Sequence, residues 1–182
     1  MPAACTAPAT LRINRAPVLT LWATVVAERL GFAHDEALTL GRAVAGLNAY
    51  SKGVALGLFT PSPKEVRAKR VRLRPQETIM VDLLQRAVPA VHTKDGLRAL
   101  AGVKPVDPAS VERYLSSRFG AGYAAARAAM RELARSRPPA RLAREGYALY
   151  EKFRPAVAAG VSGWGAAGTL DLAAIERLAQ PQ

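Results

Sequence analysis

The segment from Lys64 to Arg74 constrains the fold most, because it carries six positively charged side chains and only one acid. Such charges repel one another unless an anionic group lies nearby, so the segment has to remain at the surface. Its last part alternates between arginine and an aliphatic residue. This period of two predicts a strand whose arginines form a ladder on the solvent side: Arg70, Arg72 and Arg74.

The chain before this segment predicts two packed helices. Residues 1–17 are small, polar and rich in proline, which indicates a flexible arm. Apolar residues then recur at helical spacing over residues 19–30, and Gly31 interrupts them. Asp35 is placed to cap a second helix that runs toward Ser51. We therefore expect a helical hairpin.

The chain after this segment predicts a small antiparallel sheet followed by helices. Glu77–Leu84 and Arg86–His92 are rich in β-forming residues, and Pro89 favours an edge position for the second of them. From Thr93 onward the pattern is typical of a helix, and Gly102 ends a short first one.

Four further signals organise the C-terminal half. Asp107–Pro108 has the residue types of an N-cap and a first helical turn, and Asp171 is placed to cap a last helix. Residues 123–136 are alanine-rich and predict another helix. The glycines of Gly160–Gly168 predict a loop around Trp164.

Together these signals predict a mostly α-helical fold of the α+β class. We expect a flexible arm over residues 1–17, a helical hairpin with a small central antiparallel sheet over residues 18–92, and a helical domain over residues 93–182. The two larger parts either fold separately or pack as one unit. With 182 residues, half of them hydrophobic, the chain can bury a core without a disulfide or a metal.

Ala23–Arg42 resembles the helix-turn-helix pattern of bacterial DNA-binding proteins. Ala27 stands where two helices touch closely and Gly31 stands at the turn. Apolar residues occupy the positions that such a motif buries: Val26, Leu30, Phe32, Ala37 and Leu40.

This resemblance implies that the second helix faces the major groove of DNA. It places three residues near base edges: His34, Thr39 and Arg42. The following β-region would serve as a wing, as in winged helices. The departure from the pattern is Asp35–Glu36 at the start of the second helix, because carboxylates oppose phosphate. A plain helical hairpin is the alternative.

Two sets of cations are candidates for contacts with phosphate. The first is the basic segment, with Lys64, Arg67, Lys69, Arg70, Arg72 and Arg74. The second is the face of the alanine-rich helix, where Arg127, Arg131 and Arg135 follow one another at intervals of four. A charged edge strand and a solvated helix face are the structural alternatives.

A net charge of +12 and an isoelectric point near 10.7 favour an acidic partner. Few aromatic residues accompany the cations, so duplex DNA is favoured over RNA, which stays possible. We expect a DNA-binding protein without catalytic activity, as in nucleoid-associated, repair-accessory or regulatory proteins, and a homodimer is possible. A protein-interaction module with a basic face for an acidic partner is one alternative.

An enzyme that acts on a phosphorylated or nucleic-acid substrate is the other alternative, with Glu77, Asp82 and His92 as its candidate acids and bases. No catalytic motif supports it, and no spacing indicates a metal or another cofactor. A single cysteine, Cys5, and no apolar run long enough to cross a membrane predict a cytoplasmic protein, and the abundance of arginine and alanine suggests a bacterial cytosol or nucleoid.

Overall fold

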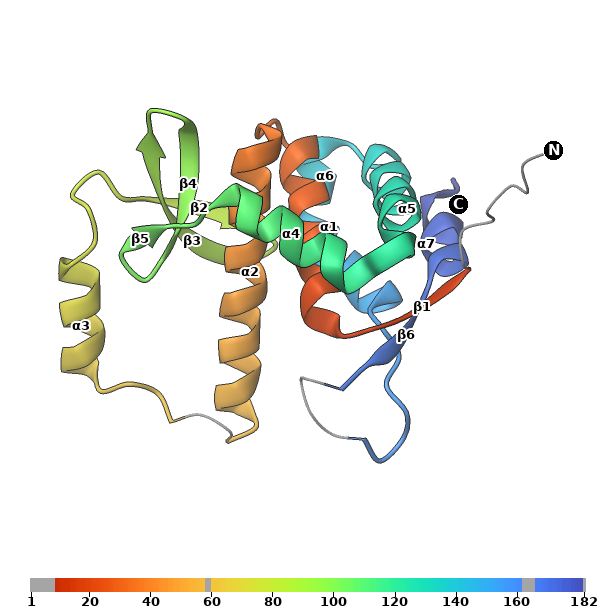
Figure 1. Ribbon diagram of the computed structural model, residues 1–182, viewed down its shortest axis with the longest axis horizontal. Coiled ribbons are helices and arrows are strands. Elements are labelled where there is room, and N and C mark those ends of the chain that lie inside the picture. Colours follow the sequence, from red (N-terminus) through yellow and green to blue (C-terminus); the bar gives the residue numbers. More distant parts are fainter. Residues whose placement is uncertain (1–8, 58–59, 162–165, 182) are drawn as a thin grey trace.

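The computed structural model describes residues 9–57, 60–161 and 166–181, and its helices enclose a core flanked by a small sheet (Figure 1). The helices are α1 (Arg15–Arg29), α2 (His34–Ala55), α3 (Lys64–Arg72), α4 (Pro108–Phe119), α5 (Tyr123–Arg135), α6 (Pro139–Phe153) and α7 (Leu172–Ala179), with a 3₁₀ turn at Gly120–Gly122. The strands are β1 (Thr10–Ile13), β2 (Ile79–Leu83), β3 (Arg86–Thr93), β4 (Gly96–Ala101), β5 (Lys104–Pro105) and β6 (Gly168–Asp171). The mixed helix-and-sheet fold expected from the sequence is confirmed.

Helix α1 is the central element, and every residue from Pro17 to Ala27 is buried. This sequence is apolar on all faces of a helix, which is typical of a helix surrounded by others. Helices α2, α4, α5 and α6 all pack against it. Its threonines satisfy their hydroxyls within the helix, since Thr24 Oγ1 donates to the carbonyl of Thr20 at 2.8 Å. Trp22 Nε1 donates to the carbonyl of Gly146 at 2.8 Å and so links α1 to α6.

Helices α1 and α2 form the expected hairpin, with Gly31 in the turn at a φ of +107°. The closest approach of the two helices lies at Gly41, where a Cβ atom would stand 2.6 Å from the carbonyl oxygen of Thr20 and would overlap the Thr24 hydroxyl. The helix-turn-helix resemblance predicts the close contact at Ala27. That residue is buried, and the lack of a side chain at Gly41 is what sets the crossing.

The expected cap at Asp35 is wrong. Ala33 is the N-cap residue of α2, and its backbone N–H donates to the carboxylate of Glu36 at 3.1 Å. Asp35 is exposed in the first turn of the helix. Either acid suits a helix N-terminus, because the helix dipole favours negative charge there.

The larger sheet has the strand order β2-β3-β4-β5, and the predicted β2–β3 hairpin is confirmed. Its two-residue turn places Leu84 and Gln85 at φ values of 48° and 62°, as the twist of a tight hairpin requires. Leu84 is buried against α6, where a Cβ atom on Gly146 would stand 2.5 Å from it. The hairpin turn therefore anchors the sheet to the helices.

Two sequence expectations about this sheet are wrong. The helix expected from Thr93 to Gly102 is strand β4, which pairs with β3 across a turn at Lys94 and Asp95, so the boundary expected at residues 92–93 falls inside a hairpin. The segment Leu97–Leu100 has three apolar residues and Arg98, and it is too short for its period to separate strand from helix. Pro89 lies on an inner strand, one residue beyond the end of the β3–β4 ladder at Ala90.

The arm expected over residues 1–17 is ordered from Thr10 onward. Residues 10–13 form β1, which pairs antiparallel with β6, and α1 begins at Arg15. Residues 1–8, with Cys5, lie outside the described residues, as does Trp164.

The start signals of the C-terminal half are confirmed. Asp107 Oδ1 accepts the backbone N–H of Ala109 at 3.2 Å at the start of α4, and Asp171 Oδ1 accepts that of Ala173 at 2.9 Å at the start of α7. The apolar side chains of these helices join those of α1, α2 and the sheet in one core. No helix within the described parts of the chain is both long and apolar enough to cross a membrane.

Candidate nucleic-acid interface

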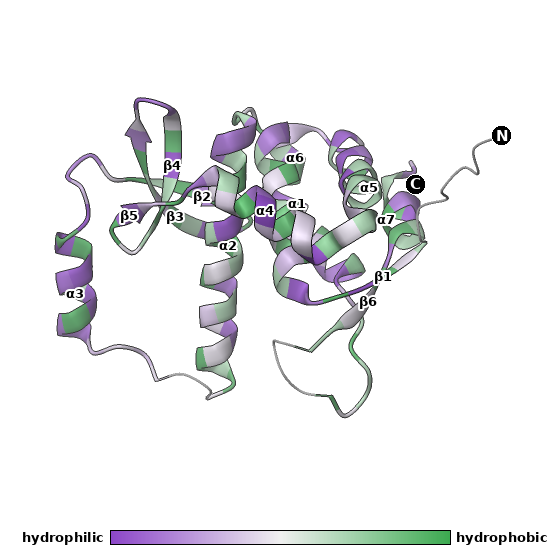
Figure 2. Ribbon diagram, in the orientation of Figure 1, coloured by the Kyte–Doolittle hydropathy of each residue, from purple (hydrophilic) through white to green (hydrophobic). Residues whose placement is uncertain are grey.

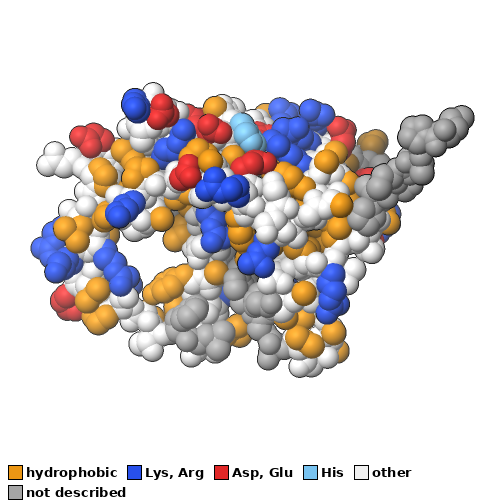
Figure 3. All heavy atoms as spheres, viewed as in Figure 1, with side chains coloured by type: hydrophobic (Ala, Val, Ile, Leu, Met, Phe, Trp, Pro, Cys, Tyr) orange, Lys and Arg blue, Asp and Glu red, His pale blue; other side chains and the backbone are white. Residues whose placement is uncertain are grey.

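The basic segment forms helix α3, which stands apart from the rest of the molecule (Figure 1). All nine of its residues are exposed and none is buried. Figure 3 shows its lysine and arginine side chains on the outside of the molecule and an opening between α3 and the main body. Charged side chains of this kind stay at the surface because water solvates them, and they do not pack in a core. They are therefore available to a ligand.

The predicted arginine ladder is wrong, because Lys64–Arg72 is helical and not extended. Lysine, arginine and alanine favour helix, and an alternation over five residues is a weak strand signal. Residues two apart in a helix point about 200° apart, so Arg70 and Arg72 lie on opposite sides. The helix ends before Arg74, which precedes Pro75 and is therefore disfavoured in a helical conformation.

The cations of this segment have no acidic partner in the described parts of the chain. Within the described ranges, neither a hydrogen bond nor an ion pair engages any of their side chains: Lys64, Arg67, Lys69, Arg70, Arg72 and Arg74. Glu65, the acid within the segment, is exposed in the first turn of α3 and pairs with none of them. The segment is therefore a concentration of uncompensated positive charge, as the sequence predicts.

A groove of about 620 Å³ continues this charge from the end of α3 toward α2 and α4. Three cations line it: Arg42, Arg74 and Arg118. Its remaining wall is apolar, with Leu47, Pro89, Leu100 and Val106. No carboxylate lines the groove among the residues that the structure describes.

Tyr114 holds two of the groove cations in place. The guanidinium carbon of Arg42 lies 4.5 Å from the centre of its ring and that of Arg118 lies 5.7 Å from it. The ring attracts both cations through its quadrupole and thereby offsets part of their mutual repulsion. The sequence pattern does not indicate Tyr114 and Arg118 as groove residues, because they lie on α4, far along the chain from Arg42 and Arg74.

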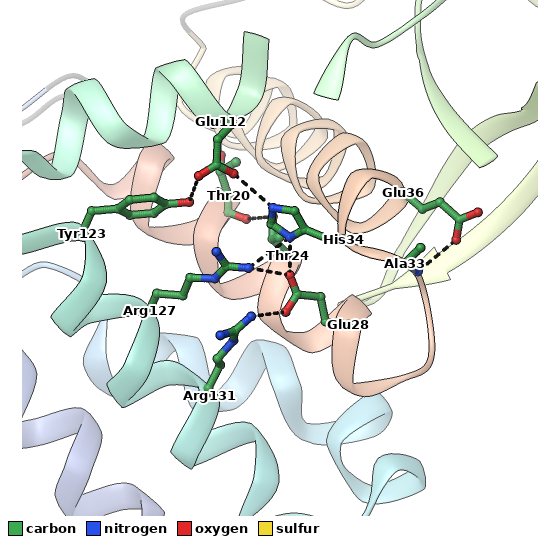
Figure 4. A network of polar contacts seen from close by, with 10 residues as sticks. All are labelled: Thr20, Thr24, Glu28, Ala33, His34, Glu36, Glu112, Tyr123, Arg127 and Arg131. Carbon is green, nitrogen blue, oxygen red and sulfur yellow. Dashed lines mark hydrogen bonds and ion pairs between the residues drawn. The ribbon is translucent and has the colours of Figure 1, made fainter. Parts of the chain in front are cut away.

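The second predicted set of cations lies on one face of α5 as expected, but two carboxylates partly neutralise it (Figure 4). Arg127 Nη2 donates to Glu28 Oε1 at 3.0 Å, and Arg131 Nη2 donates to Glu28 Oε2 at 3.2 Å. Arg135 Nη1 donates to Glu132 Oε1 at 2.9 Å. The α5 face therefore offers less free positive charge than its sequence indicates.

Glu28 is the centre of this cluster, and it sits at the end of the buried helix α1 with its side chain 18% exposed. Burial alone would raise the pKa of Glu28, but the hydrogen bond with His34 and the charges of Arg127 and Arg131 outweigh it and hold the pKa below its ordinary value. Burial and the hydrogen bond to Glu112 raise the pKa of Tyr123, so its phenol stays protonated and donates to Glu112 Oε1 at 2.9 Å.

The three residues expected near base edges have three different environments. His34 Nδ1 lies 2.6 Å from Glu28 Oε1 and its Nε2 lies 3.2 Å from Glu112 Oε2, so the ring bridges two carboxylates (Figure 4). Thr39 is fully buried, and its hydroxyl accepts the backbone N–H of Ala99 on β4 at 3.0 Å. Thr39 therefore cannot reach a base edge in this fold. Arg42 is exposed and lines the groove.

The candidate acids and bases of an enzyme lie on β2 and β3 or shortly before them. Glu77, Asp82 and His92 are exposed and none of them lines the groove. Within the described ranges, no group of three or more His, Cys, Asp or Glu residues is placed to hold a metal ion. The arrangement of uncompensated cations beside an apolar groove suits the binding of an anion.

Comparison with known proteins finds no matching family model, no matching curated protein and no matching solved structure.

Proposed function

We propose that this protein binds duplex DNA without catalysing a reaction on it, and that α3 and the groove cations contact the phosphates. One observation carries the proposal. Among the residues that the structure describes, six unpaired cations lie on a segment that ends, at Arg74, in a groove with two further cations and no acid. The phosphate backbone of DNA presents negative charges at regular spacing over the length of such a segment.

Contacts of this kind give affinity and little sequence selectivity. Lysine and arginine side chains on phosphate position a protein on the duplex, whereas base edges have to be reached for direct readout of the sequence. The roles that fit are those of a nucleoid-associated, repair-accessory or regulatory protein in a bacterial cytosol. The groove cations are arginines, whose planar fork suits phosphate oxygens.

The helix-turn-helix resemblance stays a prediction, and we place the main contact elsewhere for two reasons. Thr39 is covered by β4, and His34 is held between Glu28 and Glu112. Asp35 is exposed at the start of α2, where it would repel phosphate. Of the three residues that the resemblance indicates, Arg42 is the one that we assign to the interface.

A salt titration on duplex DNA tests the proposal. With eight cations at the interface, the logarithm of the association constant is expected to fall with the logarithm of salt concentration with a slope of about −7. Changing Arg67, Lys69, Arg70 and Arg72 together to glutamine is expected to weaken binding and to make the slope shallower by about 3 to 4. Fluorescence anisotropy of a labelled duplex measures both quantities.

The matched control removes the same charge from other surfaces. Arg12, Lys94, Arg144 and Lys152 are exposed, and within the described residues none of their side chains has a hydrogen-bond or ion-pair partner. Their joint replacement by glutamine is expected to leave most of the affinity and the slope in place. Equal losses in the two variants would mean that net charge alone attracts DNA and that α3 is not the contact.

A protein with an acidic surface is the second candidate partner, because α3 also exposes apolar side chains. Val66 is 41% exposed, Val71 54% and Leu73 62%. Exposed aliphatic residues of this kind are typical of protein contacts. In that case, replacing these three residues by glutamine would abolish capture of the partner, while binding of duplex DNA would be weak and fully suppressed at physiological salt.

A further inference from the structure

A second cationic pocket lies at the C-terminal part of α2, where its lining residues Arg15 and Asn48 are next in sequence to Ala16 and Ala49 of the groove. Its volume is about 280 Å³, and it is lined by the start of α1, the C-terminal part of α2, and the end of α6 with the chain that follows. Its polar lining consists of Arg15, Asn48, Lys52, Tyr147, Tyr150 and Arg154.

The three cations of this pocket face one space without an acid. No carboxylate is among its lining residues, as far as the described chain extends. Arg15 is oriented by one hydrogen bond, from Nε to the carbonyl of Pro155 at 3.1 Å, which leaves both of its Nη groups unengaged. The side chains of Lys52 and Arg154 have no hydrogen-bond or ion-pair partner within the described ranges.

Asn48 adds a buried donor to these cations. Its side chain is 1% exposed, and its Oδ1 accepts Arg86 Nη2 at 3.0 Å and the Tyr147 hydroxyl at 3.1 Å. Because arginine can only donate, the amide oxygen has to face Arg86, which fixes the orientation of the amide. Its Nδ2 donates no hydrogen bond among the described residues. It is not one of the fully buried polar atoms without a partner, so a molecule in the pocket can accept a hydrogen bond from it.

We infer that this pocket binds the phosphate group of a small molecule, with Arg15, Lys52 and Arg154 as its cations and Asn48 Nδ2 as a neutral donor. Three charges suit a dianion better than a carboxylate, and arginine fits phosphate oxygens in pairs. The volume lies just below the usual range for ligand sites and exceeds that of a phosphate group, so part of the molecule that carries the phosphate also fits. The site is independent of the proposed binding of DNA by α3.

Isothermal titration with inorganic phosphate, adenosine 5′-monophosphate and adenosine tests the inference. Binding of inorganic phosphate at a ratio of one per chain, and no binding of adenosine, are expected. Tighter binding of the monophosphate than of inorganic phosphate would identify a phosphate ester as the ligand, and equal binding would identify the free anion. Absence of binding of both phosphates at millimolar concentration would overturn the inference.

Paired variants separate the pocket from the general positive charge. Changing Lys52 and Arg154 to glutamine is expected to weaken phosphate binding by at least about tenfold, because each charged hydrogen bond contributes that much. Changing Arg144 and Lys152, two other cations of α6, removes the same charge and is expected to leave binding within about twofold, since exposed charges at a distance are screened by salt. Similar losses in both variants would show attraction without a site.

A spectroscopic signal locates the ligand without a mutation. Addition of phosphate is expected to shift the side-chain amide resonances of Asn48 in a ¹⁵N–¹H spectrum, whereas chloride at equal ionic strength leaves them in place. The variant of α3 that lacks Arg67, Lys69, Arg70 and Arg72 is expected to retain this response. Loss of DNA binding and loss of phosphate binding are therefore distinguishable outcomes.

Discussion

Glu28 determines how much of the positive charge on α5 is available to a ligand. Its two carboxylate oxygens accept hydrogen bonds from Arg127 and Arg131, and His34 approaches the first of them. The side chain is partly buried, so these interactions are screened less by solvent than those of the exposed pair between Arg135 and Glu132.

Replacing Glu28 by glutamine is expected to reduce stability in a pH-dependent way. The folded pKa of Glu28 lies below its ordinary value of 4.5, so the carboxylate stabilises the fold above that value, and the contribution is lost as the pH falls through the folded pKa. At neutral pH the variant should lose about 1–3 kcal/mol of the free energy of unfolding. The difference from the unmodified protein should shrink between about pH 5 and pH 3, as urea denaturation at a series of pH values can measure.

Glu132 provides the comparison for this measurement. Its side chain and that of Arg135 are each about two-thirds exposed, so the glutamine variant at residue 132 should have nearly the stability of the unmodified protein at every pH. A Glu28 variant whose deficit stayed constant down to pH 3 would show that lost packing, and not lost charge, is responsible.

Gly41 makes a second residue-scale prediction. Alanine at residue 41 would bring a Cβ atom within 2.6 Å of the backbone oxygen of Thr20, so the α1–α2 crossing would have to open. We expect a loss of about 1–3 kcal/mol in the free energy of unfolding. Gly46 lies on the same helix with nothing within 4 Å of such a Cβ, and alanine there should stabilise by up to about 1 kcal/mol. Urea denaturation of both variants measures the contrast, and equal effects would contradict the close crossing.

At the scale of the element, α3 differs from the longer helices because none of its residues is buried and most of them are hydrophilic (Figure 2). Helices α1, α2, α4, α5 and α6 each bury an apolar side of the helix, whereas α3 buries no residue. An isolated helix of nine residues is marginal in water, and its cations repel one another. Binding to a polyanion would remove that repulsion and so favour the helical form.

Hydrogen exchange can measure this difference between elements. The backbone amides of α1 are expected to exchange only on global unfolding, since the helix is surrounded by α2, α4, α5 and α6. The amides of α3 are expected to exchange at rates close to those of an unfolded chain, and to become protected when duplex DNA is added. Strong protection of α3 in the free protein would show that it docks on the body and is not available as proposed.

At the scale of the whole molecule, the structural features that the sequence predicts best are those set by short-range signals. The N-caps at Asp107 and Asp171 and the turn at Gly31 depend on a few adjacent residues, and all three are confirmed. Strand β4 was not predicted because the three apolar residues of Leu97–Leu100 fit a helix as well as a strand. Strand β1 was missed because its partner, β6, lies at the other end of the chain.

The candidate interface likewise combines a feature that the sequence predicts with features that depend on the fold. The positive charge of residues 64–74 could be predicted from the sequence, because unpaired charge in such a run has no place in a core. The groove could not, since Arg42, Arg74 and Arg118 come from three separate segments. Nor could the neutralisation of α5, because it depends on where the fold brings Glu28.

The pairing of β1 with β6 sets the order in which the protein can be completed during synthesis. Residues 10–13 are synthesised well before residues 168–171, which are their only strand partners within the described chain. Until β6 has been translated, the backbone groups of β1 lack these partners. The covering helices α4, α5 and α6 also follow α1 in the sequence, so the apolar surface of α1 stays accessible to solvent while they are made, and this interval is when a chaperone would be of most use.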